Sequence, residues 1–183
     1  MLELPFRKPK IRFTFSFFAV VGLVSAAGGA AAVQLAVILL CSLTHELGHI
    51  SVMCLFGMPP EALTFYAGGI RLSDSCLYCG RARTAAVLLA GCAVNLISAG
   101  ISLLLGYAGL FAAANLALGL FNLLPFRYFD GGRLYTELTG REPPALLRMA
   151  ALLPAAGLAV LSVIRGSIPF SLIATAVIIL CDG

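Results

Sequence analysis

The sequence predicts an all-α, polytopic membrane protein with about six transmembrane helices, and three observations lead to this prediction. Of its 183 residues, 61% are hydrophobic and only 11% are charged, against roughly a quarter charged in an ordinary soluble domain. The 12 Lys and Arg and 8 Asp and Glu residues are too few to cover a soluble globule of this length. Long apolar runs recur from end to end, so the expected surroundings are a lipid bilayer. A net charge of +4 on so apolar a chain argues against nucleic acid as a partner.

Six apolar segments are long enough, or nearly so, to cross the hydrocarbon layer, which takes about 20 residues. We expect one integral membrane domain over residues 1–183, with a bend near Gly28 and Gly29 and the fourth helix ended by Pro125. A short helical stretch is expected after Asp130. The expected helices span about 13–32, 33–57, 84–107, 109–124, 145–164 and 168–181.

The connection between the second and third helices is too elaborate for a simple turn. Residues 64–72 place apolar and aromatic side chains on both sides of Gly68 and Gly69. This pattern predicts two short strands in a hairpin. Because the segment is so apolar, we expect the hairpin to be associated with the membrane.

The distribution of basic residues predicts the orientation. If both termini are cytoplasmic, 11 of the 12 Lys and Arg residues lie on the cytoplasmic side and only Arg165 lies on the other. Cytoplasmic loops carry such an excess of positive charge. The 11 are Arg7, Lys8, Lys10, Arg12, Arg71, Arg81, Arg83, Arg127, Arg133, Arg141 and Arg148. We therefore expect a multi-pass protein whose termini and long connections face the cytoplasm.

The second helix carries the motif most typical of catalysis, His45-Glu46-Leu47-Gly48-His49. Positions i and i+4 share one helix face, so two imidazole nitrogens can bind one Zn²⁺ at about 2.0–2.1 Å. Glu46, beside them, can take a proton from the attacking water. Ionisable groups at membrane depth are costly and usually functional. A metal centre is therefore favoured over polar residues that merely satisfy one another inside a bundle.

A catalytic zinc usually has three protein ligands, and the chain contains only two His residues. The third ligand must therefore be a carboxylate or a Cys. Asp130 lies on the same membrane side as the end of the second helix, and Gly131 and Gly132 permit a tight backbone approach. Considered alone, Asp130 is more typical of an N-cap on the following helix, so the residues leave this choice open.

Three motifs together resemble the site-2 protease family of intramembrane zinc metalloproteases. They are the His45–His49 motif, 90–95 (AGCAVN) in the third helix, and 121–125 (FNLLP) followed by Asp130-Gly131-Gly132. Six helices suit the sporulation-type branch, which cleaves membrane-associated pro-sigma factors. The resemblance implies zinc held by His45, His49 and Asp130, with Glu46 as the catalytic acid and base.

The resemblance also implies a membrane-associated protein substrate, with a membrane regulatory partner as a further expectation, in a bacterial plasma membrane with the active site open to the cytoplasm. Relatives often carry a CBS or PDZ domain, and the 183 residues contain neither. The family commonly has Pro where this chain has Cys92. Asn95 and Asn122 are therefore assigned either to substrate binding or to interhelical hydrogen bonds.

Substrate binding is also expected at the hairpin, where an unwound segment can add as a strand beside Gly68 and Gly69. Cys76 and Cys79 form a lone CxxC pair, which is more typical of two loop thiols than of a redox site. Cys41 lies one turn before His45 and is expected to line the site without binding metal. The alternatives to a protease are a zinc carrier and an inactive membrane scaffold.

Overall fold

The computed structural model describes residues 2–4, 10–67, 69–73 and 80–150. The chain divides into two compact units, Met1–Asn122 and Leu123–Gly183, and each is described by itself. Gly68, the Cys76–Cys79 pair and the expected helix over 168–181 lie outside the described residues. Of the expected helix 145–164, residues 145–150 are described, and they are helical.

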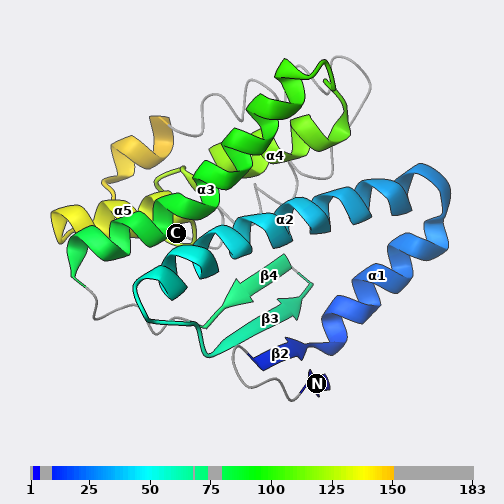
Figure 1. Ribbon diagram of the computed structural model, residues 1–183, viewed down its shortest axis with the longest axis horizontal. Coiled ribbons are helices and arrows are strands. Elements are labelled where there is room, and N and C mark those ends of the chain that lie inside the picture. Colours follow the sequence, from blue (N-terminus) through cyan, green and yellow to red (C-terminus); the bar gives the residue numbers. More distant parts are fainter. Residues whose placement is uncertain (1, 5–9, 68, 74–79, 151–183) are drawn as a thin grey trace. The chain divides into compact units, whose positions relative to one another are not determined.

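Four helices form most of the first unit (Figure 1). They are α1 (Phe15–Ala27), α2 (Gly29–Leu55), α3 (Arg81–Leu104) and α4 (Leu110–Asn122). The longest, α2, packs against both α3 and α4, and α3 also packs against α4. The expected boundary at residues 32 and 33 is wrong. The chain turns at Gly28 instead, where φ is 70°, a conformation that glycine adopts without steric cost.

The first unit also contains a four-stranded sheet, so the all-α prediction is wrong in part, although the chain is mostly helical. The strand order is β1 (Leu2–Leu4), β2 (Lys10–Phe13), β3 (Ala62–Tyr66) and β4 (Gly69–Leu72). β3 and β4 pair antiparallel, as two strands of a hairpin do, with Tyr66 opposite Gly69. β2 pairs parallel with β3 and antiparallel with β1.

The residues that join the N-terminal strands to the first helix hold them against β3. Phe13 stacks on Phe65 with ring centroids 4.6 Å apart. The backbone N–H and the Oγ1 hydroxyl of Thr14 both donate to the carbonyl oxygen of Phe65, at 2.9 and 3.0 Å. The alternation of charged and apolar residues in β2 (KIRF) is typical of a strand. Together these contacts fix the start of α1 on the hairpin.

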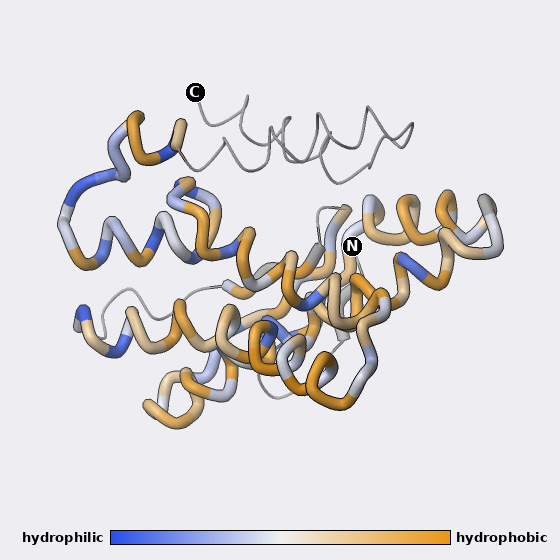
Figure 2. The backbone as a smooth tube through the Cα atoms, turned by 90° about the horizontal axis from the view of Figure 1, so that it is seen from above, coloured by the Kyte–Doolittle hydropathy of each residue, from blue (hydrophilic) through white to orange (hydrophobic). Residues whose placement is uncertain are grey.

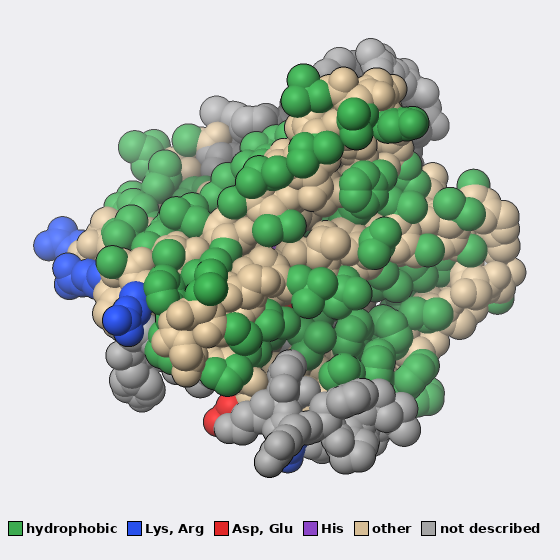
Figure 3. All heavy atoms as spheres, in the orientation of Figure 1, with side chains coloured by type: hydrophobic (Ala, Val, Ile, Leu, Met, Phe, Trp, Pro, Cys, Tyr) green, Lys and Arg blue, Asp and Glu red, His purple; other side chains and the backbone are tan. Residues whose placement is uncertain are grey.

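The surface is that of a membrane protein. The helices α2 and α3 are long and apolar enough to cross a membrane, while α1 and α4 are apolar but shorter. Figure 2 shows runs of hydrophobic residues interrupted by few hydrophilic ones, and Figure 3 shows hydrophobic side chains over most of the described surface in that view. Large apolar side chains such as Leu23, Leu104 and Leu55 are 75–89% exposed. That these and the other expected helices cross a membrane stays a prediction.

The described part of the second unit is built around a short helix, α5 (Asp130–Thr139). A Cβ added to Gly131 would collide with the backbone of Leu123, and one added to Gly132 would collide with the backbone of Phe126. The expected close approach is therefore confirmed, and it serves to pack the first turn of α5 against the preceding loop.

Candidate metal centre

The helix α2 buries one narrow stripe of its surface, and both His residues of the HExxH motif lie in it. The buried residues of α2 are Cys41, His45, Gly48, His49 and Met53. Cys41, His45, His49 and Met53 follow one another at intervals of four residues, and Gly48 is three residues after His45, so all five lie along one side of the helix. The side chains of His45 and His49 are only 5% and 6% exposed, so these polar rings are enclosed within the bundle of α2, α3 and α4.

Hydrogen bonds that the imidazoles donate to oxygen atoms of α3 fix the tautomer of both rings. Nδ1 of His49 lies 2.7 Å from the carbonyl oxygen of Val87. A carbonyl oxygen only accepts, so this nitrogen carries the proton. Nδ1 of His45 lies 3.2 Å from Oδ1 of Asn95, which also accepts. With Nδ1 carrying the proton, Nε2 is the atom of each ring that is left to offer a lone pair, as a metal-binding histidine does.

The two Nε2 atoms lie only 3.1 Å apart, with the rings almost perpendicular. Two lone pairs at that distance repel each other unless they share a cation, either a proton or a metal ion. Two nitrogens on one tetrahedral Zn²⁺ are separated by about 3.3 Å, given bonds of about 2.0–2.1 Å. The pair of imidazoles therefore has the separation and the protonation that a zinc ion requires.

Small residues let α3 approach the imidazoles closely. A Cβ added to Gly91 would lie 2.5 Å from Nε2 of His49 and 2.8 Å from Cε1 of His45. A Cβ added to Gly48 would lie 2.8 Å from the backbone oxygen of Ala90. Small residues allow such crossings between membrane helices. Gly91 and Gly48 thus bring α3 directly against the HExxH motif.

Asn95 makes the interhelical hydrogen bonds that were one of its two predicted roles. It is fully buried. Its Oδ1 accepts from His45, as described above, and its Nδ2 donates over 3.4 Å to the carbonyl oxygen of Cys41. Both ends of the amide are thus held by α2, so Asn95 orients the His45 ring. Partners of this kind fix the tautomer and direction of a metal-binding histidine.

Two buried residues that were not predicted as site residues lie in the same bundle. Cys92, which is 1% exposed, follows Gly91 on α3, and its Sγ lies within 4.8 Å of a ring nitrogen of His45. Asn115, on α4, is fully buried, and its Nδ2 donates to Sγ of Cys41 at 3.1 Å. The available signal was its place as an amide in the middle of an apolar, Ala-rich helix. Cys41 contacts the amides of both Asn95 and Asn115, through its backbone oxygen and its Sγ atom. It was expected to line the site without binding metal.

The remaining predicted residues are placed as follows. Glu46 is half-buried on α2, directly after His45. Gly69 begins β4, at one edge of the sheet. The amide of Asn122 donates to the carbonyl oxygen of Leu118 within its own helix.

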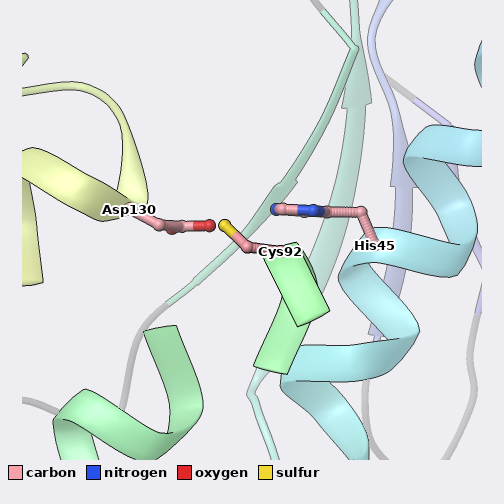
Figure 4. A group of neighbouring side chains, drawn as sticks. All are labelled: His45, Cys92 and Asp130. Atoms are coloured by element: carbon pink, nitrogen blue, oxygen red, sulfur yellow. The ribbon is translucent and has the colours of Figure 1, made fainter. Parts of the chain in front are cut away.

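Asp130 is the first residue of α5 in the second unit and is labelled in Figure 4 together with His45 and Cys92. The cap alternative for this residue is wrong, because the N-cap is Phe129, whose backbone is extended. The carboxylate lies instead in the first turn of α5, where the interaction of a negative charge with the helix dipole stabilises the helix by about 0.3–1 kcal/mol.

Comparison with known proteins places this fold. No protein-family model and no curated protein matches the chain. A solved structure does match it, that of the site-2 protease from Methanocaldococcus jannaschii, with a TM-score of 0.61. The match has 22% sequence identity and covers 90% of this chain and 84% of the other. The two chains share a fold, which agrees with the family resemblance of the sequence motifs.

Proposed function

We propose that this chain is an intramembrane zinc metalloprotease that cleaves peptide bonds in or next to a membrane-associated segment of its substrate. The observation that carries the proposal is the buried pair of imidazoles, with both Nδ1 atoms bonded as donors and both Nε2 atoms facing each other at 3.1 Å. The fold shared with a site-2 protease supports it. The sporulation-type resemblance suggests a pro-sigma factor or another membrane-tethered regulator as the substrate.

His45 and His49 would hold the zinc, and we propose Asp130 as the third protein ligand. Bound zinc would polarise the scissile carbonyl and make water a stronger nucleophile at neutral pH. Glu46 takes the proton of the attacking water and delivers it to the leaving amine. Asn95 keeps His45 in the tautomer that leaves Nε2 available, and it is therefore a positioning residue.

The substrate must present an unwound segment, because a helix keeps its carbonyl groups in its own hydrogen bonds. β4 is an edge strand of the sheet and lies beside α2. An extended substrate segment can add to such an edge through main-chain hydrogen bonds. We propose that the segment pairs at β4, starting near Gly69, and so reaches the helix that carries Glu46.

An apolar groove supports the approach of a membrane-embedded segment. It has a volume of about 200 Å³ and lies between α1, α2, α4 and the end of β3. Ser42 lines it from α2, three residues before His45, and Tyr66 lines it from the hairpin. We propose that the substrate enters from the lipid along this groove, and that the termini and the opening of the site face the cytoplasm.

The central test separates the base from the metal ligands. Purified Glu46→Gln should retain one zinc ion per chain and lose cleavage of a fluorescent transmembrane peptide by about 10²–10⁴-fold, because an amide cannot accept the proton. His45→Ala should lose both zinc and cleavage. Glu61→Gln is the matched control, since it removes an exposed carboxylate next to β3. Near wild-type cleavage by Glu46→Gln would contradict the proposed base.

A second test concerns Asp130. Asp130→Ser should lower zinc affinity by at least about tenfold, whereas Glu137→Gln, which removes another carboxylate of α5, should not change it. A loss of the helix-dipole interaction alone would reduce stability only slightly. Full zinc occupancy in Asp130→Ser would remove this residue from the ligand set. A protein that binds zinc and transports it, or that cleaves nothing, would favour the carrier or scaffold alternative.

A further inference from the structure

The buried thiol of Cys92 lies beside a histidine of the candidate metal centre. Figure 4 shows its side chain, which extends from α3, together with the side chain of His45. The Sγ atom lies within 4.8 Å of a ring nitrogen of His45, and both residues are buried. Gly91, directly before Cys92, contacts both imidazoles closely. The same short piece of α3 therefore lies against both imidazoles and brings a sulfur atom near the ring of His45.

Among the described residues of the first unit, the buried thiols of Cys41 and Cys92 differ in their surroundings. The Sγ atom of Cys41 accepts a hydrogen bond from Asn115 on α4, so this sulfur has a structural role between two helices. Cys92 lies on the side of α3 that holds the imidazoles. Thiolate sulfur and imidazole nitrogen are the ligands that zinc prefers. The residues His45, His49 and Cys92 thus offer a set of donors typical of zinc.

The separation is close to what shared coordination requires. With bonds of about 2.3 Å to sulfur and 2.0–2.1 Å to nitrogen, two ligands of one tetrahedral zinc lie about 3.6 Å apart. The observed upper limit is 4.8 Å. The sulfur and the His45 nitrogen therefore need to approach each other by at most about 1.2 Å to bind the same ion.

We propose that Cys92 is an exchangeable thiolate ligand of the metal centre formed by His45 and His49. This inference rests on the proposed function and adds a ligand to the same site. Binding removes the proton of the thiol and forms a sulfur–metal bond, and the proton passes to solvent. When water replaces the sulfur, that bond breaks and the thiolate takes up a proton again.

The consequence is a site that opens and closes. Catalytic zinc sites keep one position free of protein ligands, whereas sites with four protein ligands are closed and structural. With Asp130 as a third ligand, Cys92 supplies the fourth and holds the centre in a closed resting state. Substrate cleavage then requires that the Cys92 thiolate leaves the metal.

The test replaces zinc by Co²⁺, whose absorption reports its ligands. The full chain carrying Cys76→Ser and Cys79→Ser, which removes the CxxC thiols, is purified in detergent, freed of metal and titrated with Co²⁺. A near-ultraviolet sulfur-to-cobalt charge-transfer band should appear together with the visible bands of the bound ion. Adding Cys92→Ser should abolish the charge-transfer band, retain the visible bands and weaken Co²⁺ affinity by at least about tenfold.

Cys41→Ser is the matched control, because it removes the other buried thiol near His45 and should leave the band unchanged. Cobalt bound without a charge-transfer band, or a band that survives Cys92→Ser, would overturn the ligand assignment and leave the proposed protease intact. Absence of any Co²⁺ binding would instead overturn the metal centre, and the ligand assignment with it.

A second measurement tests the closed state. At saturating zinc, Cys92→Ala should cleave the transmembrane peptide several-fold faster per bound zinc ion, because the competing ligand is gone. An unchanged or lower rate per zinc ion would overturn the resting-state role of the thiolate.

Discussion

The helix α3 packs closely against α2 and against α4, and a glycine lies at each of these contacts. The atoms next to the two glycines differ. Toward α2, the space beside Gly91 is filled by the rings of His45 and His49. Between α3 and α4, the space beside Gly119 is filled by the side chain of Leu96, whose Cγ would lie 2.9 Å from an added Cβ. The first contact holds the two imidazoles in place, whereas the second packs two helices, with Cβ of Asn95 at an ordinary contact distance of 3.4 Å from the added atom.

The difference shows how small residues serve two purposes within one membrane bundle. A leucine side chain can change its rotamer and make room for a methyl group. The imidazole rings cannot move aside in this way, because each Nδ1 atom already donates a hydrogen bond to an oxygen atom of α3. The same substitution should therefore have a large effect at one contact and a small effect at the other, and four predictions test this comparison.

The largest effect is expected for Gly91→Ala. The added methyl group must displace both rings, so zinc affinity should fall by about 100-fold or more, beyond the usual loss for a residue next to a metal ligand. Equilibrium titration with zinc measures it. A variant that folds and binds zinc as tightly as the wild type would show that the imidazoles adapt, and the comparison would fail.

The next largest effect is expected for Asn95→Leu, which keeps the volume of the side chain and removes the acceptor of the His45 Nδ1 proton. The ring loses its fixed tautomer, so zinc affinity should decrease by about 10–100-fold. Asn95→Asp retains an acceptor and should recover part of this loss. Equal affinity in Asn95→Leu and the wild type would remove the positioning role.

A smaller effect is expected for Asn115→Leu. Asn115 is the buried amide of α4 and serves as the matched comparison for Asn95. Asn115 is as buried as Asn95 but bonds Cys41 Sγ and the Phe111 backbone oxygen, and its Oδ1 has no hydrogen-bond partner among the described residues. Losing one such bond costs about 0.6 kcal/mol, and removing an unsatisfied acceptor offsets it. Zinc affinity should change by less than about tenfold, and a larger loss would extend the functional network to α4.

The smallest effect is expected for Gly119→Ala. Displacement of Leu96 is opposed by the gain in helix propensity of about 0.5–1 kcal/mol that alanine brings. The free energy of unfolding should therefore change by no more than about 1 kcal/mol, with zinc binding and cleavage preserved. Loss of zinc in this variant would mean that the packing of α4 controls the metal site.

Much of the candidate site was predictable because its signals are local. The spacing of His45 and His49 places them on one helix face whatever the rest of the chain does. The small residues at Gly28 and Gly29 predicted the bend. The apolar runs predicted α2 and α3, since the length needed to cross a membrane is set by the bilayer.

Other features depend on partners far away in the sequence. Lys10 pairs with Ala62, and a strand of four residues is stabilised only by such a neighbour. The alternating KIRF segment did carry a strand signal, but its basic residues were interpreted as determinants of orientation. The residues alone left Asp130 open between a helix cap and a metal ligand, and the conformation of the preceding loop places the N-cap at Phe129.

The sequence by itself determined that the protein is apolar, mostly helical and equipped with two histidines one turn apart. Only the tertiary structure decided which nitrogen of each ring carries a proton, because Val87 and Asn95 reach the rings from another helix. It also decided that the thiol of Cys92 lies beside His45. Periodicity along one helix fixes which residues share a face, whereas the packing of α3 on α2 fixes what that face meets.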